Sequence, residues 1–185
     1  MKKQPTDRLQ TNQFGMLAAV IGFVLVAIYG TLALSAQDPM WFLTGFDERP
    51  TRVIVYRVGQ RIELQVGQPG FDELAEAVRS SLAQGVSRSS GIGLSEGSLQ
   101  DAYSLNLTLE VFFDHPVKLH AGFNTDKPRQ MLFPITGRHS EMSVVFLGSG
   151  DNYMSNAPVL KTVEPIRSTL KSLGFLSRNV PCPCV

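Results

Sequence analysis

The chain has 185 residues, and its 17 basic and 16 acidic side chains leave a formal net charge of +1. Because it contains no basic run, the sequence lacks the electrostatic footprint of a nucleic-acid-binding protein and a polybasic site for anionic lipid. Both cysteines lie within the last four residues, which excludes an internal disulfide framework, so the fold must depend on an apolar core.

The segment between Arg8 and Asp38 carries no charged side chain. Its apolar centre, residues 14–36, contains 23 residues, of which 11 are Leu, Ile, Val or Phe. As a helix it would be about 35 Å long, which is enough to cross a hydrocarbon core of about 30 Å. We therefore expect a transmembrane helix at 14–36, preceded by a short N-terminal tail at residues 1–13.

The charges on either side of this segment predict its orientation. Basic residues dominate before it, and the first charged residues after it are acidic, so the N-terminus should be cytoplasmic and the C-terminal part extracytoplasmic. The alternative is a cleaved signal peptide, with Leu34-Ser35-Ala36 as the small-residue cleavage site. A secretory apolar region usually has about 7 to 15 residues, so the longer run here favours an uncleaved single-pass anchor.

Small residues recur at four-residue spacing within the predicted helix, at Gly15 and Ala19 and at Ala18 and Gly22. Such faces let two helices approach closely. Besides the lipid bilayer, we therefore expect a membrane-protein partner or self-association. The helix contains no ionisable side chain, which argues against transport or proton conduction.

Residues 37–50 should connect the membrane to the soluble part as an interfacial segment and linker. Asp38 precedes Pro39, and proline disfavours helix in the residue before it, so the helix should end there. Trp41 has two interpretations: its ring suits the membrane–water interface, or it packs beneath the soluble domain. Residues 45–50 read as a short linker.

Residues 51–176 are enough for one globular domain. It should begin with a hairpin of two strands, at 51–58 and 61–66, joined by a Gly59-Gln60 turn. We interpret residues 86–97, which are rich in Ser and Gly, as a flexible loop. Ser98 should then cap a short helix that ends at Ser104, with Asp101 completing a capping box.

Two amphipathic helices are predicted, at 71–82 and 163–173, from apolar residues at helical spacing. The first should end at Gly85, and the second should be capped by Thr162 and end at Gly174. The apolar faces comprise Phe71, Leu74, Val78 and Leu82 in the first helix and Val163, Ile166, Leu170 and Leu173 in the second.

Further strands are predicted at residues 105–111, 117–123, 130–136 and 142–147, followed by a turn at 148–152. Adjacent strands with short connections favour antiparallel pairing, and two amphipathic helices can cover one face of such a sheet. The predicted fold class is therefore α+β: one N-terminal transmembrane helix followed by a mostly antiparallel sheet packed by two amphipathic helices.

No pattern in the sequence assigns a metal or catalytic site. His120 and His139 could share a metal with Glu141 or Asp114 if their strands paired, but the spacing matches no zinc pattern, and we interpret these histidines as surface or turn residues. Ser149 lies between two glycines with His139 as a conceivable base, but it lacks the nucleophile elbow of hydrolases. We assign no catalytic, cofactor-binding or metal-binding residues.

Three weaker motifs also carry simple interpretations. The glycines at 91 and 93 lack the remaining residues of a nucleotide-binding loop. Asn106 begins a formal glycosylation sequon inside a predicted strand, which we attribute to chance. Cys182 and Cys184 belong to a tail, residues 177–185, that we expect to be unstructured. Free thiols, a local bridge, an intermolecular disulfide, a prenylation box and a metal pair are the alternatives, of which the last two fit poorly.

These features favour a non-enzymatic extracytoplasmic domain that acts as an accessory, assembly or sensing component of an envelope complex. One alternative is an anchored hydrolase that uses His139 with Ser149 or Glu141, which requires a pocket where these side chains converge. Another is a receptor for a small ligand, which the sequence does not identify; an apolar pocket beside residues 86–97 would mark it. We also expect a fragment beginning near Pro50 to fold alone without metal or disulfide.

Overall fold

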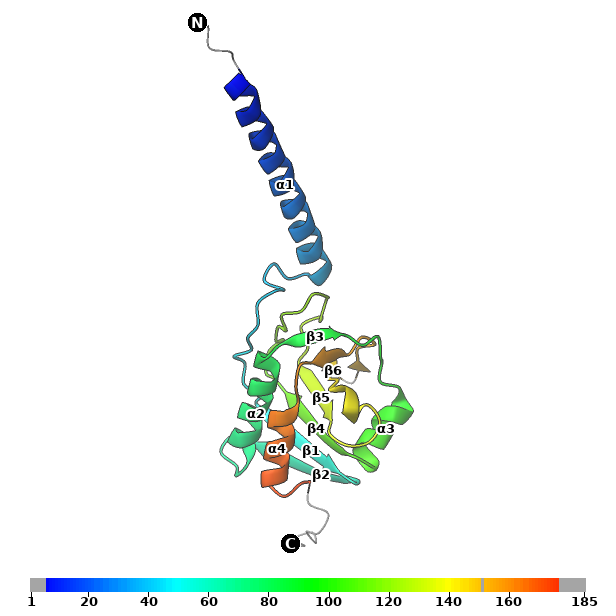
Figure 1. Cartoon of the computed structure of the whole chain (residues 1–185). Helices are drawn as coiled ribbons and strands as arrows, with labels where there is room; N and C mark the ends of the chain where they lie inside the picture. Colours follow the sequence, from blue (N-terminus) through cyan, green and yellow to red (C-terminus); the bar gives the residue numbers. More distant parts are fainter. Residues whose placement is uncertain (1–5, 151, 177–185) are drawn as a thin grey trace, which may run out of the picture.

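A long, isolated helix at the N-terminus leads into a compact body of strands and helices (Figure 1). The computed structural model describes residues 6–150 and 152–176. The helix, α1, runs over Thr6–Ala36, and its stretch Gln13–Ala36 has a mean hydropathy of 2.4 with none of its most apolar window buried. It is long and apolar enough to cross a membrane, a property that an anchor and a signal sequence share.

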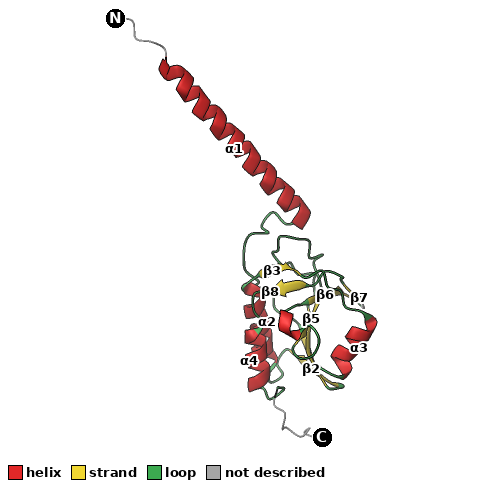
Figure 2. Ribbon diagram, turned by 45° about the vertical axis from the view of Figure 1, so that its right-hand side comes forward, coloured by secondary structure: helices red, strands yellow, loops and turns green. Residues whose placement is uncertain are grey.

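The main sheet has six strands in the order β2-β1-β4-β5-β6-β7, and every neighbouring pair is antiparallel. A second sheet pairs β3 with β8, also antiparallel, and lies at the end of the domain nearest α1 (Figure 2). The predicted α+β class is confirmed. The strands are β1 Arg52–Arg57, β2 Gln60–Gln65, β3 Val86–Ser89, β4 Leu107–Phe112, β5 Gln130–Pro134, β6 Phe146–Ser149, β7 Asn152–Tyr153 and β8 Pro158–Leu160.

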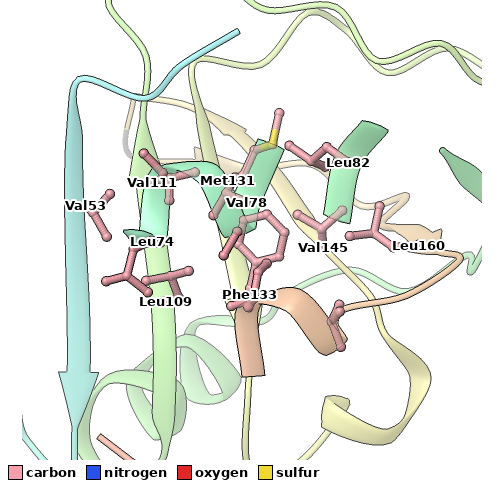
Figure 3. Packing of buried hydrophobic residues seen from close by; sticks show 14 of the residues in the cluster. Val53, Leu74, Val78, Leu82, Leu109, Val111, Met131, Phe133, Val145 and Leu160 are labelled. Carbon is pink, nitrogen blue, oxygen red and sulfur yellow. The ribbon is translucent and has the colours of Figure 1, made fainter. Parts of the chain in front are cut away.

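Helices α2 (Phe71–Ala83) and α4 (Glu164–Ser172) pack on one face of the main sheet and enclose its core. Both predicted amphipathic helices are confirmed, since Leu74, Val78 and Leu170 are fully buried. Figure 3 shows side chains of this core from several strands and helices, packed as one cluster. Thr162 is not the N-cap predicted for α4, because Val163 occupies that position, although the Thr162 hydroxyl accepts a hydrogen bond from the Glu164 amide at 3.1 Å.

The opposite face of the sheet is covered only in part, by α3 (Glu96–Ser104), by a 3₁₀ turn, η1 (Ser140–Met142), and by the chain around β8. Because successive side chains of a strand point to opposite faces, Leu109 faces α2 and α4 whereas Glu110 faces this second side. A smaller apolar cluster forms there from Leu132, Val144, Phe146, Ala157 and Val159.

The first hairpin turns one residue earlier than predicted. Arg57 pairs with Gln60, so the two turn residues are Val58 and Gly59, with φ of 48° and 79°. Positive φ at both central residues is the geometry of the type I′ turn, whose twist matches that of the flanking strands. The predicted Gly59-Gln60 turn is wrong because it would place Gln60 outside the ladder.

The predicted loop at residues 86–97 is also wrong over its first four residues. These residues form β3, because β8 supplies a pairing partner about 70 positions later in the chain. The helix that follows is capped by Ser95, whose hydroxyl accepts a hydrogen bond from the Ser98 amide at 3.2 Å. Ser98 therefore receives the cap rather than providing it, and the Asp101 capping box does not form.

Residues 117–123, predicted as a strand, belong instead to an irregular connection at 113–129. Val117, Leu119 and Ala121 are nevertheless buried, so alternate side chains of this segment face the protein. An extended chain produces that alternation whether or not a strand pairs with it. The strand predicted at 142–147 begins later than predicted, because the chain first makes η1 and β6 begins only at Phe146.

Residues 45–50 are not a free linker. Phe46 is only 3% exposed, belongs to the main core, and meets the Phe113 ring edge-on at 5.9 Å between ring centroids. Pro50 is buried as well. The domain therefore begins structurally before the first strand, and its connection to α1 is short.

Candidate functional site

Asp38, two residues beyond α1, lies at the junction between the helix and the domain. It is only 3% exposed, and its carboxylate contacts Lys118 Nζ and His120 Nδ1, each at 2.7 Å. The Met40 amide donates a third hydrogen bond at 2.9 Å. Burial on its own would raise the pKa of Asp38, but these three donors outweigh it and lower the pKa to about 2. The carboxylate thus ties the helix end to the irregular connection at 113–129.

A second buried carboxylate, Glu110, lies in the middle of the partly covered sheet face. It is 4% exposed and accepts hydrogen bonds from three hydroxyls: Tyr56 and Tyr103, each at 3.1 Å, and Tyr153. Burial, together with the negative charge of Glu110, raises the pKa of all three tyrosines, so the hydroxyls remain protonated donors. The cluster joins β1, α3 and β7 to the central strand.

A cavity of about 170 Å³ opens between α3 and this sheet face. Its floor is apolar and includes Ala102, Leu132 and Phe146, whereas Asp101 and Arg138 are exposed at its edge. Leu94, from the segment that precedes α3, also lines it. The cavity therefore lies beside residues 86–97, the position at which a pocket would mark the alternative of a small-ligand receptor.

His139 is the distinctive polar residue of the cavity lining. Its ring meets Phe146 edge-on at 5.7 Å, and neither ring nitrogen has a hydrogen-bond partner among the described residues. Burial, followed by the charge of Arg138, lowers its pKa, so the imidazole is neutral at pH 7. Its backbone has a φ of 72°, a left-handed conformation that is uncommon outside glycine and is found at functional sites.

The turn that presents His139 is fixed against α3. Gly137 has a φ of 78°, which favours glycine, and a side chain there would place Cβ 2.1 Å from Asn106 Oδ1, so it would also displace the Asn106 side chain. Asn106 in turn donates from Nδ2 to the Asp101 carbonyl at 3.0 Å. This sequon residue therefore has a local structural role.

The residues considered for metal binding and hydrolysis are not brought together. His120 contacts Asp38, whereas Asp114 contacts His115. Ser149 is exposed near the edge of the main sheet, and neither it nor Glu141 lines the cavity that contains His139. Within residues 6–150 and 152–176, no three His, Cys, Asp or Glu side chains are grouped as metal ligands. Cys182 and Cys184 lie outside the described residues.

The two buried carboxylates were not anticipated from the sequence. Asp38 and His120 are separated by 82 positions, and Glu110 and Tyr56 by 54. The only available signals were His120, weighed as a metal ligand, and the alternation of Leu and polar residues in β4, which puts Glu110 on the sheet face opposite Leu109. Comparisons of the chain with protein-family models, with curated proteins and with solved structures gave no match.

Proposed function

We propose that the protein is a single-pass membrane protein whose extracytoplasmic domain acts, without catalysis of its own, as a small-ligand sensing component of an envelope complex. The observation that carries the sensing role is the cavity beside α3, which offers an apolar floor and one unpartnered, neutral histidine. The hydrolase alternative has less support, because neither Ser149 nor Glu141 lines that cavity.

The size of the cavity indicates the class of ligand. An apolar cavity of about 150 Å³ accepts benzene, so 170 Å³ suits a molecule of about that size. The imidazole of His139 adds one polar contact, and a neutral ring nitrogen can accept a hydrogen bond from a hydroxyl. We therefore expect a small, mostly apolar molecule that carries one hydroxyl or a similar donor.

Binding is tested with phenol and benzene as probes, measured by NMR chemical-shift changes at Leu132 and Phe146. Phenol should bind more tightly than benzene, and His139→Gly, which tolerates the positive φ, should abolish the difference. Ala102→Phe should block both probes by filling the cavity, whereas Gln100→Phe on the exposed side of α3 should not. If neither probe perturbs these resonances, the sensing proposal is wrong.

The topology is tested separately. Protease added to spheroplasts should digest the C-terminal domain and spare an N-terminal tag, because the basic flank stays cytoplasmic. A mature N-terminus at Gln37 would show instead that α1 is a cleaved signal peptide.

A further inference from the structure

The chain reverses direction where α1 ends. Gln37 has a φ of 52°, and the next residues fold back along the helix instead of extending away from it. The Tyr29 hydroxyl donates to the Pro39 carbonyl at 2.7 Å, and its ring lies 6.5 Å from that of Phe42, measured between centroids. Tyr29 precedes the end of α1 by seven residues, a rise of about 10 Å, so Phe42, in ring contact with Tyr29, lies beside the last turns of the helix and not beyond its end.

We call residues 39–43 the hook. Its apolar side chains Met40, Phe42 and Leu43 are exposed, and Phe42 is 55% exposed despite its contact with Tyr29. Trp41 points the other way: a Cβ at Gly122 would lie 3.8 Å from its ring, and its Nε1 is buried. The hook thus presents one apolar side outward and packs its single tryptophan under the domain, which agrees with the second interpretation of Trp41.

The position of the hook identifies what covers that apolar side. A hydrocarbon core of about 30 Å takes about 20 helical residues, which places its outer edge near Ala33 if it begins at Phe14. Tyr29 then lies about 6 Å inside that edge. Side chains that contact Tyr29 from outside the helix are therefore at the depth of the upper acyl chains.

The charges near the hook are consistent with this depth. Residues 39–46 contain no ionisable side chain. Asp38, immediately before them, is buried, paired with the Lys118 ammonium and hydrogen-bonded to His120, both from the domain. The hook can therefore enter the interface without carrying an unpaired charge into it. Its insertion does not depend on attraction between basic side chains and the lipid head groups.

We propose that the hook inserts into the outer leaflet beside Tyr29, so that lipid acyl chains cover Met40, Phe42 and Leu43 and the domain is seated directly on the bilayer surface. The connection at 113–129, drawn in yellow-green just below α1 in Figure 1, then forms the membrane-facing end of the domain. This inference rests on the proposal that α1 spans the membrane, but not on the ligand cavity.

The test uses the full chain reconstituted in phosphatidylcholine vesicles, with bromine on the upper acyl chains as a fluorescence quencher. Trp41 is the only tryptophan, so Trp41→Phe provides a silent background for single tryptophans elsewhere. The Phe42→Trp variant should lose at least as much emission as the Leu34→Trp variant, although position 42 comes later in the chain, because the hook folds back beside the last turns of α1. Leu34 is 80% exposed in the last turns of α1 and is the matched reference.

The Val66→Trp variant provides the negative control. Val66 is exposed in the turn just before α2. The other end of α2, near Gly85, lies close to Thr44 of the membrane-proximal segment, so position 66 is at the end of α2 that is far from the membrane. The emission of a tryptophan at position 66 should therefore be quenched by aqueous iodide and not by brominated lipid. Tyr29→Phe, which removes the hydroxyl bound to Pro39, should reduce the lipid quenching at position 42 and leave that at position 34 unchanged.

Other outcomes separate this inference from the topology. If position 34 is quenched by brominated lipid but position 42 is quenched less, or by iodide, α1 spans the membrane and the hook proposal is wrong. If position 42 is quenched by neither agent, protein covers the hook, either a second copy or a partner, and the lipid proposal is again wrong. If brominated lipid fails at both positions, the membrane span itself is wrong.

Discussion

Phe46 provides the sharpest test of where the soluble domain begins. It lies in a segment that looks like a linker, yet it is 3% exposed and packs in the main core against Phe113. Truncating a buried phenylalanine to alanine typically costs about 3–5 kcal/mol. We expect the lower end, about 3 kcal/mol, because Gly45 and Asp47 on either side are exposed and the segment can partly collapse into the space.

The assay is urea unfolding of a fragment comprising residues 37–185, followed by circular dichroism. With an m-value of about 2 kcal/mol per molar urea, Phe46→Ala should lower the midpoint by about 1.5 M. Phe42→Ala is the matched control: the same truncation four residues earlier, at an exposed side chain, should change the free energy of unfolding by less than about 0.5 kcal/mol.

Equal midpoints for the two variants would refute the assignment of Phe46 to the core.

A fragment that begins near Pro50 should be affected by the same contacts. That fragment lacks both Phe46 and the carboxylate of Asp38, so it should be less stable than the fragment that begins at Gln37. A fragment from Pro50 with the full stability of the longer one would contradict both contacts.

Two further predictions concern the buried carboxylates. Because the pKa of Asp38 falls from 3.8 to about 2 on folding, its contribution of about 2 kcal/mol is present above pH 4 and lost as the pH falls through 2. Asp38→Asn should therefore lower stability at pH 7 and flatten the acid dependence in urea unfolding between pH 4 and 2, and a parallel dependence would contradict the ion pairs. Glu110→Gln should cost about 1–3 kcal/mol, since one amide oxygen cannot accept from three hydroxyls. It should also lower the pKa of Tyr56, which burial and the charge of Glu110 raise, so an ultraviolet titration of the tyrosines that does not change would argue against the cluster.

The sequence determined the elements whose structure is encoded locally. Apolar residues at helical spacing located α2 and α4 together with the faces they bury. An uncharged run located the apolar length of α1, although the helix begins at Thr6, within the predicted N-terminal tail. A run of residues that favour strands located β1, and the alternation of apolar and polar residues located β2 and β4, each within one or two positions. These predictions succeeded because period and composition report which side of a local element is buried, independently of what covers it.

Tertiary structure decided everything that depends on partners distant in the sequence. Val86–Ser89 becomes a strand only because β8 lies beside it, and Glu110 is buried only because tyrosines from three other elements converge on it. His139 was singled out, but its proposed partners, Ser149 and Glu141, lie outside its cavity, and residues of α3 and the sheet take their place. Sequence periodicity says that a face is covered; only the packed chain decides which side chains cover it, because those contacts join positions that no local pattern relates.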